Sequence, residues 1–244
     1  MIPLFKSHFS IGKSILRLGG GEGIFDIARD LKLDKVVLVE DSLTGFLETA
    51  KMSKCYDIPF IMGLRISVCE SDTSTDKSDC HKVIVFAKNG DGCKLLNKVY
   101  TKTFSGGGSS ILLKELKELW DNDLFKLSIP FYDSFIFNNK LLFSKCMPNF
   151  NFTEPTLFIE DNGLPFDSLV QDEIKTVMQK NNTFKSEKVK SIYYNKKSDF
   201  SAFQTYKLIC NRSNWSGKST SLECPNLDHC GSKNFCVESY LEQV

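Results

Sequence analysis

Residues 34–68 read DKVVLVEDSLTGFLETAKMSKCYDIPFIMGLRISV, and this stretch decides the fold. Its two ends, 36–40 and 60–68, are nearly continuous apolar runs, which is typical of strands that are buried on both faces. Between them, apolar positions recur at helical spacing and predict an amphipathic helix. The positions expected to face inward are Leu43, Phe46, Leu47 and Ala50. The stretch therefore predicts a strand–helix–strand unit with parallel strands.

The same alternation continues on both sides. A strand is predicted at the start of IPLFKSHFS (2–10), and a helix over 21–33. Further strands are predicted at 81–89, 123–129, 139–146, 155–161 and 188–195. Further helices are predicted at 90–104, 111–120 and 167–180, the last with Asp167 as a capping acid. Repeated units of this kind indicate a parallel sheet covered by helices, so we expect one closed or nearly closed α/β barrel.

Composition excludes several classes. The chain has 244 residues, enough for one large domain or two small ones, and its formal net charge of +1 gives no bulk attraction for nucleic acid. The N-terminus carries no signal-peptide pattern, and no apolar run reaches the length of a membrane span. We therefore expect a cytoplasmic protein without a membrane partner. Its nine cysteines are expected to be mostly reduced and buried.

In α/β barrels the chemistry lies at the carboxyl ends of the strands. The side chains that follow the predicted strands are His8, Glu40, Asp41, Arg65 and the segment Tyr193–Asn195. These residues are the first candidates for a functional site.

The chain resembles the PHP (polymerase and histidinol phosphatase) domain found at the N-terminus of bacterial DNA polymerase III alpha subunits. The resemblance is carried by PLFKSHFSI (3–11), by residues 34–68, and by HKVIVFAKNGDGCKLLNKV (81–99). It continues through LKELKELWDNDLFKLS (113–128), SAFQTYKLICNRS (201–213) and FCVESYLEQV (235–244). It implies a distorted (β/α)7 PHP-type barrel over 1–205 and an extension over 206–244 similar to the connection to the polymerase palm.

The resemblance also implies where the metal ligands of the family would fall. The positions in this chain are Lys6, His8, Lys13, Glu40, Asp41, Arg65, His81, Pro130, Tyr193 and Asn195. Histidine is retained only at His8 and His81, and the position of the family's first histidine holds Lys6. A metal cluster needs lone pairs from imidazole, carboxylate or thiolate, which protonated lysine and arginine do not offer.

Lys6, Lys13 and Arg65 are therefore expected to replace the metal charge and to pair with Glu40 and Asp41. Such an ion-pair network would hold the barrel without a metal. Replacing Lys6 or Arg65 with alanine should then destabilise the fold.

The resulting hypothesis is a non-catalytic scaffold or interaction module of DNA replication, with no cofactor. Its expected partners are a DNA polymerase or other replication proteins, with DNA itself a further candidate, in a bacterial or phage-infected cell. One alternative is a phosphoesterase or 3′–5′ exonuclease in which His8, Glu40, Asp41 and His81 hold zinc or manganese. Another is a module that binds phosphate or nucleic-acid ends through Lys6, Lys13 and Arg65.

Overall fold

The computed structural model describes the chain except for residues 10–13, 71–79, 106–108, 182 and 211–230. Its strands form one mixed sheet in the order β2-β1-β8-β7-β6-β4-β3-β5, and a further pairing of β2 with β3 closes seven of them into a barrel. The strands are β1 (Ile2–Phe5), β2 (Val36–Glu40), β3 (Phe60–Cys69), β4 (Cys80–Ala87), β5 (Ser110–Leu112), β6 (Phe125–Ile129), β7 (Thr156–Ile159) and β8 (Lys185–Ile192).

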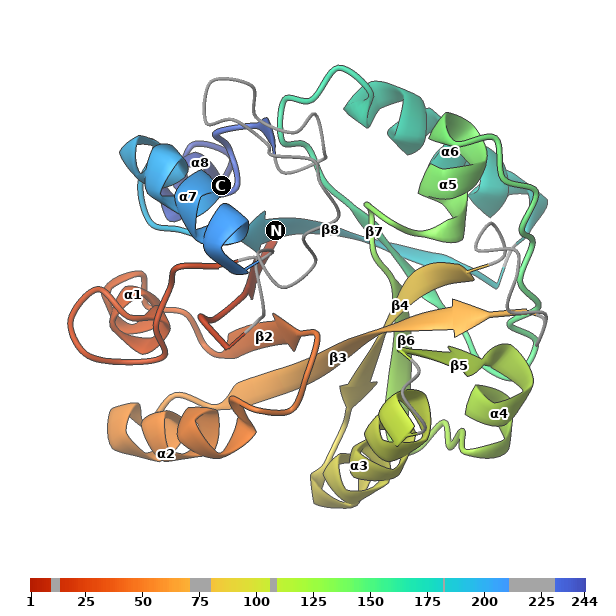
Figure 1. The fold of residues 1–244 in the computed structure, drawn as a ribbon, viewed down its shortest axis with the longest axis horizontal. Coiled ribbons are helices and arrows are strands. Elements are labelled where there is room, and N and C mark those ends of the chain that lie inside the picture. The colour runs from red at the N-terminus through yellow and green to blue at the C-terminus, as the bar shows by residue number, and fades with distance from the viewer. Residues whose placement is uncertain (10–13, 71–79, 106–108, 182, 211–230) are drawn as a thin grey trace. The chain divides into compact units, whose positions relative to one another are not determined.

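Helices follow most of the strands along the chain and are labelled in Figure 1. They are α1 (Ile24–Asp30), α2 (Phe46–Tyr56), α3 (Gly90–Phe104), α4 (Leu113–Glu118), α5 (Phe135–Leu141), α6 (Asp167–Lys180), α7 (Phe200–Cys210) and α8 (Val237–Leu241), with a short 3-10 helix at Lys197–Asp199. The expected fold class, a distorted α/β barrel, is confirmed. Within the described segments, every helix is too short or too polar to span a lipid bilayer.

The chain divides into two compact units. The first comprises Met1–Met62, Asp161–Pro165 and Val189–Val244. In it, β1 pairs in parallel with both β2 and β8. The core of this unit combines residues from its first and last segments: Phe5, Leu18, Ile24, Phe25, Leu38, Ile192, Val237 and Tyr240. The first strands and the last helix are therefore held by the same hydrophobic core.

The second unit comprises Gly63–Glu160 and Phe166–Lys188. Here β6 pairs with β7 in parallel and with β4 in antiparallel orientation, while β7 pairs in parallel with β8. Helices α3 and α5 pack on β4, and α5 packs on α6. The bounds of α3 and α6 coincide with those predicted from apolar spacing.

The sheet is mixed, so the expectation of parallel strands throughout was wrong. Strand β4 runs antiparallel to β3, with Arg65 opposite Ile84 and Val68 opposite His81. The reason lies in the connection: residues 70–79 are too few for a helical crossover, which takes a dozen residues or more. A direct return between neighbouring strands is antiparallel.

Four local predictions also need correction. The strand predicted at 139–146 is wrong, because α5 occupies the first part of it and begins where the Ser134 hydroxyl accepts a hydrogen bond from the Phe137 amide. Leu47 points outward and is 74% exposed, while Thr49 is buried in its place. Asp167 is the first residue of α6 and no cap; its carboxylate accepts from the Tyr132 hydroxyl at 3.0 Å. Strand β5, at the start of the predicted helix 111–120, was missed.

Two of the cysteines are bonded. Cys69 and Cys80 stand directly opposite each other in the antiparallel β3–β4 pair and form a disulfide. The expectation of reduced cysteines missed this pair, because it depends on a register that cysteine spacing alone does not give. The other described cysteines are not disulfide-bonded, and Cys55 is exposed instead of buried.

Gly92 allows α3 to begin against the segment before β6. A Cβ at this position would lie 2.5 Å from the carbonyl oxygen of Leu124, a backbone atom that cannot move aside alone. We expect Gly92→Ala to lower the free energy of unfolding by about 2 kcal/mol, as overpacking does. Urea denaturation measures this. Gly90→Ala in the same helix is the matched control, because its Cβ would meet no atom within 4 Å. Equal stability of the two variants would contradict the prediction.

Candidate functional site

The carboxyl ends of β1 and β2 bring the first candidate residues together. The two strands are parallel neighbours with Phe5 opposite Leu38, so Lys6 and Ser7 follow β1 beside Glu40 at the end of β2. Lys6 and Glu40 are both buried. Charged side chains at such positions must find partners, because an isolated buried charge is strongly unfavourable.

Lys6 is paired with Asp41. Its ammonium Nζ lies 2.8 Å from Asp41 Oδ2 and donates a hydrogen bond to it. The Lys6 side chain is only 5% exposed, whereas that of Asp41 is 26% exposed. Of the pairings predicted for Lys6, Lys13 and Arg65 with Glu40 and Asp41, that of Lys6 with Asp41 is present.

Glu40 is held by the residue that follows Lys6. Its Oε1 accepts two hydrogen bonds from Ser7, one from the amide at 2.8 Å and one from the hydroxyl at 2.6 Å. Its Oε2 is buried and has no hydrogen-bond partner among the described residues. Burial raises the pKa of the Glu40 carboxyl to about 7, although Ser7 and the charge of Lys6 act in the opposite direction.

The other candidates of the first unit have structural roles. His8 is exposed; its amide donates to the Leu16 carbonyl, and its own carbonyl accepts from the Tyr206 hydroxyl. Tyr193 is buried, with its ring stacked on Phe203 at 5.3 Å. The carbonyl of Asn195 accepts from the Glu238 amide.

In the second unit, Arg65 is paired with Asp133. Its Nη1 lies 3.7 Å from Asp133 Oδ2, and its side chain is 6% exposed. Asp133 follows β6 in a left-handed backbone conformation with φ of 62°, and its carbonyl accepts from the Lys82 amide at 2.8 Å. Pro130, another predicted ligand position, directly follows β6 and is half-buried.

His81 is buried among apolar groups. Its Nδ1 lies 3.6 Å from Cys146 Sγ, and its ring contacts Phe135 and Phe150 edge to face. Its Nε2 is buried and has no partner among the described residues. Burial lowers the pKa of His81 to about 4, so the imidazole is neutral at pH 7.

The sequence did not single out Ser7, Asp133 or Cys146. Ser7 had a usable signal, because it stands between two candidate positions at a strand end. Asp133 and Cys146 lie far along the chain from the residues they contact, so no spacing identified them. Lys13 lies outside the described residues.

The residues present do not fit the metal cluster of the PHP family. Within the described part of the chain, no three His, Cys, Asp or Glu side chains are grouped so that they could hold a metal ion. The hydrogen bonds of the two acids agree with this. The Lys6 ammonium donates to Asp41, and the Ser7 amide and hydroxyl both donate to the same oxygen of Glu40, so these carboxylate oxygens are already engaged.

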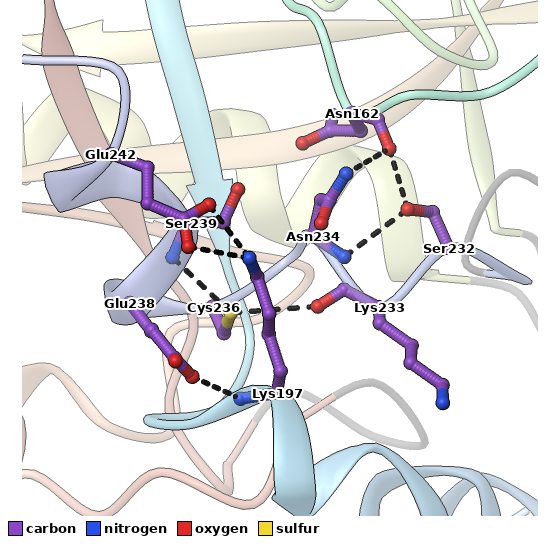
Figure 2. A network of polar contacts seen from close by, with 9 residues as sticks. All are labelled: Asn162, Lys197, Ser232, Lys233, Asn234, Cys236, Glu238, Ser239 and Glu242. Atoms are coloured by element: carbon purple, nitrogen blue, oxygen red, sulfur yellow. Dashed lines mark hydrogen bonds and ion pairs between the residues drawn. The ribbon is translucent and has the colours of Figure 1, made fainter.

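Residues 232–234, near the C-terminus, are hydrogen-bonded to Asn162 in the loop after β7 (Figure 2). The Asn162 carbonyl accepts from the Ser232 hydroxyl at 2.5 Å and from the Asn234 side-chain amide at 3.1 Å. Lys197 Nζ lies 2.6 Å from both carboxylate oxygens of Glu242. These contacts keep α8 in the core of the first unit. The division into 1–205 and 206–244 stays a prediction.

Comparison with known proteins adds little. No protein family model matches the chain, and no curated protein does. Among the matching solved structures is one from Bifidobacterium adolescentis described as "a putative metal-dependent phosphoesterase", at 18% identity and a TM-score of 0.29. The match covers 42% of this chain and spans a third (33%) of the length of that protein.

Proposed function

We propose that this protein is a PHP-like barrel in which ion pairs replace the metal cluster, and that it serves as a non-catalytic interaction module of DNA replication. One observation carries the first part: the buried ammonium of Lys6, at the end of β1, lies 2.8 Å from Asp41, at the end of β2. These are positions at which the PHP family places metal ligands. A fixed cation here supplies the positive charge that the carboxylates would otherwise take from a metal.

The second part rests on the resemblance to the polymerase III alpha subunit. In that family the domain contacts the polymerase core and, in some members, proofreading subunits. The proposed partners are therefore a replicative DNA polymerase or another replication protein. Co-elution with the purified polymerase of the same organism tests this partner directly.

A hydrolysis assay tests the non-catalytic proposal. The full chain is purified without chelators, its zinc and manganese are measured by mass spectrometry, and phosphodiester hydrolysis is followed with added Mn²⁺ and with EDTA. We expect sub-stoichiometric metal and equal rates in the two conditions. Near-stoichiometric metal, with Mn²⁺-dependent hydrolysis that Asp41→Asn abolishes, would overturn the proposal.

Glu40 favours a phosphoesterase with a rearranged site as the second candidate. A carboxyl with a pKa near 7 and a buried oxygen that lacks a partner has the properties of a general acid or base. The same assay separates the two candidates. Hydrolysis that persists in EDTA and is lost in Glu40→Gln would support an acid–base role without a metal.

A further inference from the structure

A cavity of about 860 Å³ lies in the second unit at the amino-terminal ends of β6, β7 and β8. The strand residues that line it are Phe125 and Lys126 at the start of β6, Thr156 at the start of β7, and Lys185 at the start of β8. Segments 148–154 and 183–184 complete it. Arg65 is paired with Asp133, which follows the opposite end of β6, so this cavity is separate from that ion pair.

The lining combines cations with aromatic rings. Three lysines line the cavity against a single carboxylate, that of Glu154: Lys88, Lys126 and Lys185. All three lysines are exposed; Lys185 pairs with Glu154, and Lys126 pairs with Glu187, which lies outside the lining, so a phosphate would displace these surface carboxylates. Phe152 and Phe184 also line the cavity, and both residues are half-buried.

Phe152 is held in place by its neighbours. The Phe152 ring packs edge to face on Trp120 at 5.4 Å, and its carbonyl accepts from the Asn122 amide at 2.9 Å. The indole of Trp120 in turn donates to Asn122. A ring fixed in this way needs no ordering when a planar group stacks on it.

Polar groups that suit base edges are also present. The exposed side chains of Asn151 and Asn181 line the cavity and carry both donors and acceptors.

We propose that this cavity binds single-stranded nucleic acid, with bases on Phe152 and Phe184 and phosphates at Lys126 and Lys185. Cations that follow a backbone together with rings on which bases stack are the chemistry by which proteins bind single strands without sequence preference. The volume lies within the range of ligand cavities. The inference does not depend on the proposed function, because it uses other residues.

The experiment measures fluorescence anisotropy of a fluorescein-labelled oligothymidylate with the full chain. Phe184→Leu keeps an apolar side chain and removes the ring, so we expect affinity to fall about 5-fold or more. Phe143→Leu is the matched control, because Phe143 is 86% exposed and does not line the cavity. Equal affinity of the two variants would overturn the proposal.

The lysines are tested through salt. The double variant Lys126→Gln and Lys185→Gln should lower the slope of log affinity against log salt by about 1.4, since each contact on a single strand contributes about 0.7. The control is Lys94→Gln with Lys175→Gln, two lysines that also pair with carboxylates on exposed surfaces. An unchanged slope in the first double variant, or an equal change in the control, would contradict the proposal.

Competition identifies the source of the ligand. Displacement of the labelled strand by thymidine monophosphate would support the site and assign it to nucleotides, and displacement only by unlabelled strand would support it as a strand site. Displacement by inorganic polyphosphate as effectively as by the strand would overturn the proposal, because it would leave the aromatic rings without a role.

Discussion

Replacing Lys6 with methionine is expected to lower the melting temperature by roughly 6–12 °C, which corresponds to about 3 kcal/mol in a chain of this size. Methionine keeps the buried aliphatic part of the side chain and removes the ammonium. Asp41 would then lose the cation 2.8 Å away, beside the buried carboxyl of Glu40. This loss of stability is at the lower end of the range for breaking a buried ion pair, because the Asp41 side chain is 26% exposed.

The control for this change is Lys51→Met, an exposed lysine on α2, which should leave the melting temperature unchanged. The combination of Lys6→Met with Asp41→Asn should recover part of the loss, because it removes both charges of the pair. Thermal unfolding followed by circular dichroism measures all four proteins. If Lys6→Met has the same melting temperature as the native chain, the ion pair does not stabilise the barrel.

Glu40→Gln is expected to change how stability depends on pH. The pKa of Glu40 is raised from 4.5 to about 7 in the folded chain, so the folded state holds the proton more tightly than the unfolded state. The stability that Glu40 contributes as a neutral group is complete below pH 4.5 and is lost as pH rises to about 7. The loss amounts to roughly 3 kcal/mol at 1.36 kcal/mol for each pH unit.

Glutamine is neutral at every pH and keeps the oxygen that accepts from Ser7. We therefore expect the stability of Glu40→Gln, relative to that of the native chain, to increase between pH 5 and 7. At pH 8 the variant should be the more stable protein. Urea denaturation across this range measures the difference, with Glu48→Gln on the exposed surface of α2 as the control. Parallel stability curves for the native chain and Glu40→Gln would rule out a carboxyl that titrates near neutral pH.

Much of the fold follows from patterns within short stretches. Apolar spacing predicted the bounds of α3 and α6. The resemblance led to the prediction that Lys6 pairs with Glu40 or Asp41, and it pairs with Asp41. Short apolar runs did not distinguish helix from strand, which is why α5 was predicted as a strand. The spacing of apolar residues predicts single helices and strands, but it does not predict how one element contacts another.

The partners of Arg65 and His81 could not be predicted for the same reason. Asp133 reaches Arg65 from the other side of β4, and its left-handed backbone conformation is not apparent from its neighbours in the sequence. The disulfide between Cys69 and Cys80 follows from the antiparallel register of β3 and β4. Each of these contacts depends on how strands align, and the alignment is a property of the whole sheet.

The composition of the first unit has a consequence for synthesis. Strand β1 is synthesised before the other strands of this unit, but its core includes Ile192, Val237 and Tyr240, and the Tyr240 hydroxyl donates to the Met1 carbonyl. At about 5 to 20 residues per second, β1 waits roughly 10 to 50 s for these residues. The second unit ends at Lys188, so all of its residues are synthesised before the last segment of the first unit, Val189–Val244. During that interval the apolar side chains of β1 and β2 are the part of the nascent chain that a chaperone would recognise.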